Sequence, residues 1–344
     1  MSGTSLDGID AALLKTDGIK IDAFGPGLMM PYDQDFRDHL RSALRAPFSS
    51  MNVLEQELTE RHIHAVKTLM EKSSIQPDLI GFHGQTVYHR PRTSSSPAQS
   101  RQIGKGPSMR QSLGIPVVYD FRQQDIQHGG EGAPLVPIFH QALSQNLPKP
   151  LAIVNIGGVT NLTFLTEKGL YAGDVGPGCA LIDDWMYQRL QVGYDDHGQT
   201  AAKGAVHGDL LTQWLKHPFF YQPFPKSLDR LSFVDCLEGC KNLNTPDGAA
   251  TLTVFTAQAL LQGLQSYGCQ RVILTGGGRH NVFLKKILSE HLHVQTTEDL
   301  HWQGDLLEAQ AFAYLAVRSL YNLPLTFPTT TGVKSSISGG KVLL

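Results

Sequence analysis

Several signatures of common enzyme classes are absent from this sequence. It has no GxxxxGK[ST] loop, which argues against a P-loop fold, and no GxGxxG after a strand-like run, which leaves a dinucleotide-binding fold poorly supported. It also lacks an HExxH motif and paired CxxC motifs, so no pattern indicates zinc. Only four cysteines occur, and we expect them to be reduced thiols.

Charge of one sign and long apolar runs are also scarce. The formal net charge is −2, so there is no field that would attract nucleic acid or an anionic membrane. No apolar run reaches the length of a membrane span. With 344 residues, of which 41% are hydrophobic, the chain is long enough for two folded domains. We therefore expect a cytoplasmic protein whose partners are neither nucleic acids nor membranes.

Glycine-rich turns beside apolar runs are what the sequence does contain. In Gly3–Asp10, small hydroxyl residues stand between two glycines and next to a carboxylate. Such a backbone can approach an oxyanion closely, and Asp7 can hold a hydrated Mg²⁺. A strand–turn–strand pattern of the same kind recurs at Asn155–Asn161. Ordinary hairpins remain the alternative for both segments, but the repetition predicts two related halves.

A third glycine run, Thr275–Gly278, follows an apolar strand-like run at 271–274 and precedes a helix expected from about Asn281. Such a junction presents free N–H groups and the positive end of a helix dipole. Its glycines also let a flat ligand approach the backbone. A plain strand-to-helix turn is the alternative.

Polar residues at predicted strand ends are the remaining candidates. Asp174 stands ahead of a Gly-Pro turn and of a helix expected over 180–191, and we take it as the candidate general base. A lone aspartate at such a place is more often a cap or turn residue. Glu308 lies on an apolar helix expected over 305–321, where a carboxylate needs a partner. His83 and Gln85 follow a further predicted strand with hydrogen-bonding groups suited to a sugar, although His83 alone is more often structural. Arg122 and Asp125 follow another predicted strand, next to a glycine run that indicates close approach to a ligand, and an exposed charge run is the alternative there.

Seven sequence blocks resemble, in their order, those of the anhydro-N-acetylmuramic acid kinase family: GTSLDGID, HGQTVYHRP, DFRQQDIQHGGEGAPLVP, NIGGVTNLT, DVGPG, LTGGG and EAQAFAYLA. The resemblance covers essentially the whole chain. It implies the sugar kinase/heat-shock protein 70/actin superfamily, hence an α/β fold with two ribonuclease-H-like domains flanking an ATP cleft. We expect one domain from residues 1–128 plus 329–344 and the other from 129–328. The family also suggests a homodimer.

The activity that the resemblance implies belongs to peptidoglycan recycling. ATP and water would convert 1,6-anhydro-N-acetylmuramic acid into N-acetylmuramic acid 6-phosphate and ADP. Asp174 matches the catalytic aspartate, and Glu308 is a second catalytic candidate. Mg²⁺ would bind Asp7 through water. ATP contacts are expected from three segments: Gly3, Thr4, Ser5, Leu6, Asp7, Gly8, Ile9 and Asp10; Asn155, Gly157, Gly158, Thr160 and Asn161; Gly276, Gly277 and Gly278. The alternatives are another sugar kinase of the superfamily and a non-catalytic, actin-like or chaperone-like ATP switch.

Three departures from the family pattern stand out. The family usually has a short strand before GTSLDGID, and without it we expect a weakly anchored phosphate segment. Cys179 stands where the family usually has asparagine, so an amide donor and acceptor are lost. Residues 225–230 read PKSLDR where the family usually has PKSTGRE.

Overall fold

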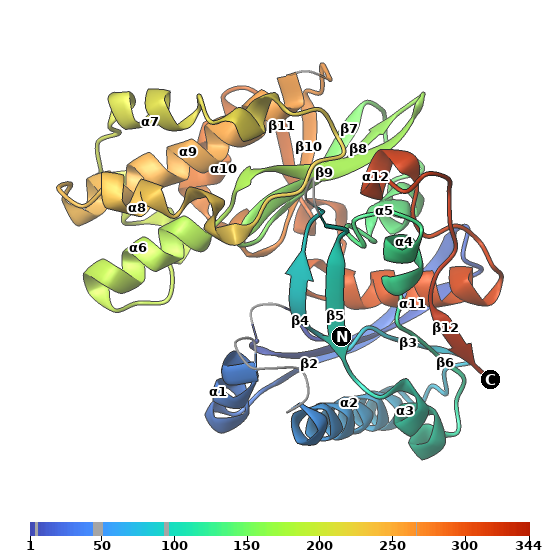
Figure 1. Cartoon of the computed structure of the whole chain (residues 1–344). Helices are drawn as coiled ribbons and strands as arrows, with labels where there is room; N and C mark the ends of the chain where they lie inside the picture. Colours follow the sequence, from blue (N-terminus) through green and yellow to red (C-terminus); the bar gives the residue numbers. More distant parts are fainter. Residues whose placement is uncertain (4–5, 44–50, 93–95, 266) are drawn as a thin grey trace. The chain divides into compact units, whose positions relative to one another are not determined.

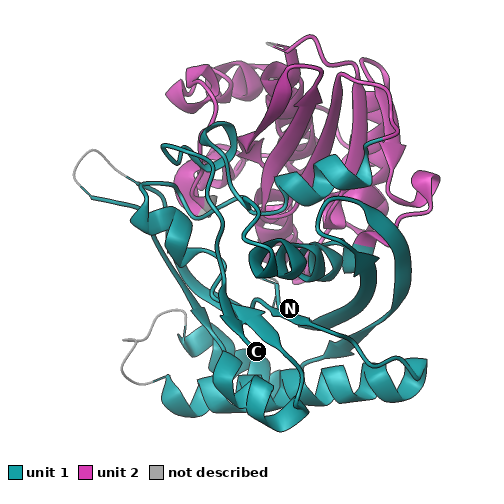
Figure 2. Ribbon diagram, turned by 90° about the vertical axis from the view of Figure 1, so that its right-hand side faces the viewer, with its two compact units in different colours: residues 1–145, 305–344 teal, residues 146–304 magenta. Residues whose placement is uncertain are grey.

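The computed structural model describes residues 1–3, 6–43, 51–92, 96–265 and 267–344, with Arg230 described by its backbone only (Figure 1). The chain divides into two compact units, one from residues 1–145 and 305–344 and the other from 146–304 (Figure 2). Residues 129–145 and 305–328 therefore pack with the first unit, whereas we expected them in the second domain. The reason is that helix α11 (Leu307–Leu320) packs against strands β1 (Gly8–Thr16) and β3 (Ile80–Phe82) of the first unit.

The second unit is built on one mixed sheet with the strand order β11-β10-β7-β8-β9. Strands β7, β8 and β9 form an antiparallel meander, and β10 and β11 add parallel strands on the other side of β7. This is the strand arrangement of a ribonuclease-H-like domain, as expected. The bounds are β7 (Leu151–Ile156), β8 (Val159–Thr166), β9 (Gly169–Pro177), β10 (Arg271–Thr275) and β11 (His293–Thr296).

Two helices cover one face of this sheet because their apolar sides match the apolar strands. Leu260 and Leu264 of α9 and Leu284 of α10 pack in one buried cluster with Val154 of β7 and Leu274 of β10. A second cluster joins the other face of α9 to α6, α7 and α8. The bounds are α6 (Ala180–Leu190), α7 (Gly208–Trp214), α8 (Asp235–Gly239), α9 (Thr245–Gln265) and α10 (Val282–Ser289), with 3₁₀ turns at Asp196–Gly198, Ala201–Lys203, Pro218–Tyr221, Arg230–Phe233, Gly277–His280, Glu298–Leu300 and Gly304–Leu306.

The described part of the first unit contains three separate groups of hydrogen-bonded strands: β1-β2, β12-β6-β3 and β4-β5. Helices α2 and α11 lie on either side of β1 (Figures 1 and 2). The other strands are β2 (Ile21–Pro31), β4 (Gln85–Arg90), β5 (Gln99–Ile103), β6 (Val117–Tyr119) and β12 (Lys341–Leu343). The other helices are α1 (Gln34–Ala43), α2 (Asn52–Ser73), α3 (Gly106–Leu113), α4 (Gln123–Gln127), α5 (Pro137–Leu143) and α12 (Pro328–Thr331).

The fold class is the expected one, a mixed α/β chain with two units. The strands expected at 78–82, 115–119 and 151–154 correspond to β3, β6 and β7. All four cysteines are free thiols. Within the described ranges, no helix combines the length and the apolar character needed to cross a membrane.

Candidate active site

Asp174 lies on β9 at a β-bulge. Thr160 of β8 pairs with Gly176, but the next residue, Asn161, pairs with Asp174, so that Val175 is the extra residue. Bulges of this kind re-aim side chains and are frequent beside active sites. The Asp174 side chain keeps part of its surface exposed.

The two oxygens of the Asp174 carboxyl group have different surroundings. The backbone N–H of Leu228 donates to Oδ2 at 2.6 Å, whereas no bond within the described residues occupies Oδ1. Burial raises the pKa of Asp174 to about 7, and the Leu228 hydrogen bond and the charge of Lys226 oppose that rise. A carboxyl group with this pKa is partly ionised at neutral pH, which is the condition a general base needs.

The tip of the β7–β8 hairpin is fixed to the start of α6. Cys179 N–H donates to the carbonyl of Gly157 at 2.7 Å, and Gly178 N–H donates to that of Gly158 at 3.0 Å. The hydroxyl of Thr160 donates to the Pro177 carbonyl at 3.0 Å, so this predicted ATP contact is used inside the unit. The hairpin tip is therefore held by backbone bonds, and the Cys179 side chain makes no capping bond.

Two glycines of the 276–278 run are required by packing. Gly276 has φ +73°, and a Cβ there would lie 2.3 Å from Oδ1 of Asn155. A Cβ on Gly278 would lie 2.3 Å from Cγ2 of Ile156. Both glycines thus let β10 and its turn approach β7 closely, and Asn155 itself pairs with Asn161 across the hairpin.

Three other glycines have room for a Cβ atom. A Cβ on Gly277 would meet no atom within 4 Å, and those on Gly157 and Gly158 would come no closer than 3.7 and 3.6 Å to the protein. None of the three has a positive φ. Neither a positive φ nor a clash therefore requires glycine at these three positions.

In the first unit, His83 and Arg122 form a connected pair. The Nδ1–H group of His83 donates to the carbonyl of Gly84 at 3.0 Å, and Arg122 Nε–H donates to His83 Nε2 at 3.1 Å. Arg122 also donates to the Gly132 carbonyl at 2.8 Å. Burial holds the pKa of His83 well below its usual range and lowers the pKa of Arg122 to about 10. At neutral pH the pair is therefore a neutral imidazole that orients a charged guanidinium group.

Glu308, in the first turn of α11, has a carboxylate that interacts electrostatically with Arg122. Its side chain reaches solvent, but the surrounding protein removes enough hydration to raise the pKa of its carboxyl group, and the charge of Arg122 opposes that shift. Its charge in turn favours the charged form of Arg122. The structure thus brings together three predicted site residues, His83, Arg122 and Glu308.

Gln85 is used to hold the start of the chain. Ser2 Oγ–H donates to its Oε1 at 2.5 Å, and its Nε2–H group donates to the carbonyl of Gly3 at 3.1 Å. The hydroxyl of Tyr32 donates to Ser2 Oγ at 2.9 Å. The segment that we expected to be weakly anchored is thus fixed at Ser2 and Gly3 by buried hydrogen bonds.

Asp125 is buried, and both of its carboxylate oxygens accept hydrogen bonds within the unit. Thr326 and Thr331 donate their hydroxyls to Oδ1 at 2.5 and 2.6 Å, and Gly132 N–H donates to Oδ2 at 2.7 Å. A Cβ on Gly130 would lie 2.1 Å from Oδ2, so this loop needs glycine to wrap around the carboxylate. These contacts connect α4 to the loop at 130–132 and to α12.

The remaining residues of the segment Gly3–Asp10 differ in their surroundings. Thr4 and Ser5 lie outside the described residues. Leu6 and Ile9 are core residues, and a Cβ on Gly8 would lie 2.5 Å from the carbonyl oxygen of Met30. Asp7 is exposed, whereas burial raises the pKa of Asp10 to about 6. Asp7 is thus the carboxylate of this segment that is accessible to a hydrated cation.

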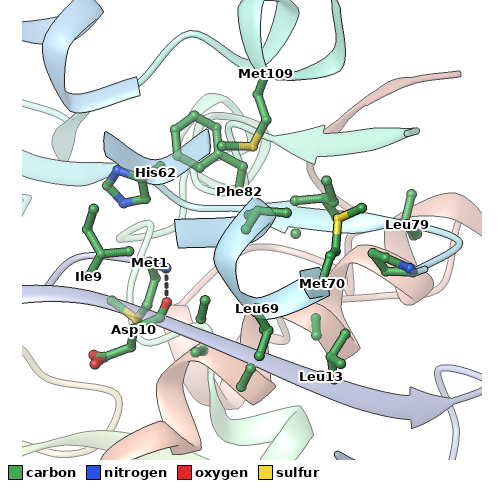
Figure 3. A pocket seen from close by; sticks show the side chains of 18 residues that line it. Met1, Ile9, Asp10, Leu13, His62, Leu69, Met70, Leu79, Phe82 and Met109 are labelled. Carbon is green, nitrogen blue, oxygen red and sulfur yellow. Dashed lines mark hydrogen bonds between the residues drawn. The ribbon is translucent and has the colours of Figure 1, made fainter. Parts of the chain in front are cut away.

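A cavity of about 80 Å³ lies in the first unit among β1, β3, α2 and α11 (Figure 3). Its lining is mainly apolar, with Leu69, Met70 and Phe82 among the side chains. His62 also lines it; its Nδ1 contacts the Leu58 carbonyl at 2.8 Å, and burial lowers its pKa to about 3. A volume of this size is far below that of ligand pockets, so the cavity is a gap in the packing and does not belong to the candidate site.

Sequence reasoning missed the contribution of Lys226 and Leu228, which hold Asp174 through their backbone groups. The available signal was the unusual block at 225–230, which we noted only as a departure.

Comparison with known proteins gives a consistent family match. The model of the family described as anhydro-N-acetylmuramic acid kinase matches residues 1–343. A protein of that name from Gluconobacter oxydans is 44% identical over 358 residues, covering 100% of this chain and 98% of the relative. Proteins of the same name from Rhodospirillum rubrum and Rhodopseudomonas palustris are 45% and 43% identical, covering 99% of this chain and 92% and 96% of those relatives.

Proposed function

This chain belongs to the anhydro-N-acetylmuramic acid kinase family, and from that premise we propose that it opens 1,6-anhydro-N-acetylmuramic acid with water and phosphorylates O6 with ATP. The products would be N-acetylmuramic acid 6-phosphate and ADP, in peptidoglycan recycling. The observation that carries the proposal is the carboxyl group of Asp174: Leu228 N–H holds Oδ2, no hydrogen bond within the described residues uses Oδ1, and burial raises its pKa to about 7.

Asp174 acts in the proposed mechanism as general base. It takes a proton from a water molecule, whose oxygen forms a bond to C1 of the sugar while the bond between C1 and O6 breaks. The released O6 then forms a bond to the γ-phosphorus, and ADP leaves. The oxygen from water ends on C1, and the proton returns from Asp174 to solvent.

The glycine-rich segments bind ATP in this proposal. The open space over Gly277, and the absence of a clash at Gly157 and Gly158, support close approach of phosphates and adenosine to the backbone. No group of three or more His, Cys, Asp or Glu side chains suited to a metal occurs in the described residues. In this proposal Asp7 would hold Mg²⁺ through water. When bound, Mg²⁺ would neutralise charge on the phosphoryl group.

Arg122 and Glu308 are the proposed sugar and water contacts. The cationic Arg122 suits the carboxylate of the sugar's lactyl group. His83 holds Arg122, and Gln85 and Asp125 act as positioning residues through the loops that they fix. We also propose a cytoplasmic location, because the reaction consumes ATP and four free cysteines fit a reducing compartment.

The test is the fate of solvent oxygen. ADP release is measured with and without the anhydro sugar, and the product formed in ¹⁸O-water is analysed at short times, before the anomeric oxygen exchanges. We expect sugar-dependent ADP release, with label on C1 and none in the phosphate. A kinase for an ordinary sugar hydroxyl would add phosphate without label at C1, and an ATP switch would release ADP independently of the sugar; either result refutes the proposal.

A further inference from the structure

Lys226 is a buried cation near the proposed base. Only 8% of its surface is exposed, and its Nζ donates to the carbonyl of Phe219 at 2.9 Å and contacts that of Phe220 at 3.5 Å. Nζ also lies 4.4 Å from the centroid of the Phe219 ring. Removing a lysine from water is costly, so this placement calls for a compensating role. Asp174 is the carboxylate whose charge acts on it.

The backbone of residues 226–228 is hydrogen-bonded to β9 at Asp174. Asp174 N–H donates to the carbonyl of Lys226 at 2.8 Å, and Leu228 N–H donates to Oδ2 of Asp174 at 2.6 Å. A Cβ on Gly173 would lie 2.6 Å from Cδ1 of Phe224 and 2.9 Å from the Lys226 carbonyl oxygen. The residue before Asp174 must therefore lack a side chain for the segment Phe224–Leu228 to pack here.

We propose that Lys226 is a positioning residue for Asp174. Its side chain joins the segment Phe224–Leu228 to the turn at Phe219 and Phe220. The segment so fixed holds Oδ2 of Asp174 and leaves Oδ1 without a hydrogen bond from the described residues. This inference rests on the proposed function, because it takes Asp174 as the general base.

The ammonium group also has an electrostatic effect that a merely structural lysine would not have. Within the described residues, Lys226 is the one charged group that acts on Asp174, and its charge favours the ionised carboxylate. Without that charge, the pKa of Asp174 rises further. The acid limb of kcat/KM then moves to higher pH, because the base is protonated over a wider range.

The experiment compares Lys226→Met with Lys226→Arg in the full chain. Methionine has a similar length but no charge or donor, and arginine keeps both. Lys241→Met is the matched control, since Lys241 is an exposed lysine of the same unit. ADP release dependent on the anhydro sugar gives kcat, KM and the pH profile of kcat/KM, and circular dichroism checks folding.

We expect Lys226→Met to lower kcat about tenfold or more, with KM for ATP within about twofold, and to move the acid limb up by about one pH unit. Lys226→Arg should restore the position of the limb, and Lys241→Met should match the unmodified chain. If Lys226→Met does not fold, Lys226→Gln, a shorter uncharged donor, carries the same test.

A folded Lys226→Met or Lys226→Gln variant with an unchanged acid limb would overturn the inference, whatever its kcat. Failure of the proposed function gives a different result. In that case the unmodified chain itself shows no sugar-dependent ADP release, or Asp174→Asn retains normal turnover.

Discussion

Nε of Arg122 donates to Nε2 of His83 over 3.1 Å, while Nδ1–H of His83 donates to the carbonyl of Gly84. With both ring nitrogens so engaged, only the neutral imidazole fits, because protonation would place a second N–H against the guanidinium group. The histidine is thus an orienting acceptor, and the cation that faces the substrate in the proposed mechanism is Arg122.

Replacing this histidine tests that division of roles. We expect His83→Leu to raise KM for the anhydro sugar by about tenfold or more, since a hydrogen bond to a charged group contributes about 1.5–3 kcal/mol. KM for ATP should change little. Steady-state ADP release at varied sugar and ATP gives both constants, with His128→Leu, an exposed histidine bonded to its own helix, as control. An unchanged KM for sugar would contradict the role.

Asp174→Asn tests the proposed base through activity. We expect the fold to persist and turnover to fall roughly 10³-fold or more, because the proton acceptor is lost. Single-turnover assays with the anhydro sugar measure the loss, and the Leu228 N–H bond can still form to the asparagine oxygen. Near-normal turnover would refute the assignment.

The same variant has an expected effect on stability, with a definite pH dependence. The pKa of Asp174 in the folded chain, about 7, lies above the ordinary value of 3.8. Between these values the folded state holds a proton that the unfolded state has lost, so the free energy of unfolding decreases as pH rises through this window. Asp174→Asn removes that decrease and should stabilise the chain by about 4 kcal/mol near pH 8 and by little near pH 4. Urea unfolding at the two pH values checks the difference, and equal effects at both would contradict it.

We expect opposite outcomes for alanine substitutions at two adjacent glycines of the run 276–278. Gly276→Ala should destabilise the fold by about 2 kcal/mol or more, because of the positive φ and the contact with Asn155. Gly277→Ala should leave the melting temperature unchanged and raise KM for ATP, because its Cβ would enter open space. Thermal melting and ATP titration of both variants give the comparison; if Gly277→Ala leaves KM for ATP unchanged, this position does not contact the nucleotide.

Substitutions at and around Asp125 test whether this residue contacts the sugar or has a structural role. Asp125→Asn should lower the free energy of unfolding by about 1–3 kcal/mol, because the hydrogen bonds from Thr326, Thr331 and Gly132 lose their charged acceptor. Thr331→Val, which removes one donor, should cost about 1 kcal/mol. Urea unfolding measures both. Unchanged stability with a raised KM for sugar would instead make Asp125 a substrate contact.

The sequence predicted features that depend on neighbouring residues, but it did not predict contacts between residues far apart along the chain. Apolar periodicity located β7, α9 and α11, because a buried face shows itself within a few residues of chain. Strand ends and the apolar helix singled out His83, Arg122 and Glu308 one by one, and only the family resemblance grouped them. The partners of Gln85 and Asp125 lie 83 and 201 positions away along the chain, and no local pattern shows such contacts.

The glycine runs show a second limit. Gly276, Gly277 and Gly278 are identical as letters, yet two of them make room for β7 and the third has open space where a side chain would stand. Lys226 was missed for a related reason, since the sequence does not show that its backbone crosses β9 at Asp174. Such distinctions require the packed structure.

The small cavity among β1, β3, α2 and α11 has a consequence for hydrostatic pressure. Water fills such a void when the chain unfolds, so the volume of the system decreases on unfolding, by an amount on the order of tens of mL/mol. Compression should therefore weaken the first unit, which carries the anchored segment at Ser2 and Gly3, without any denaturant being added.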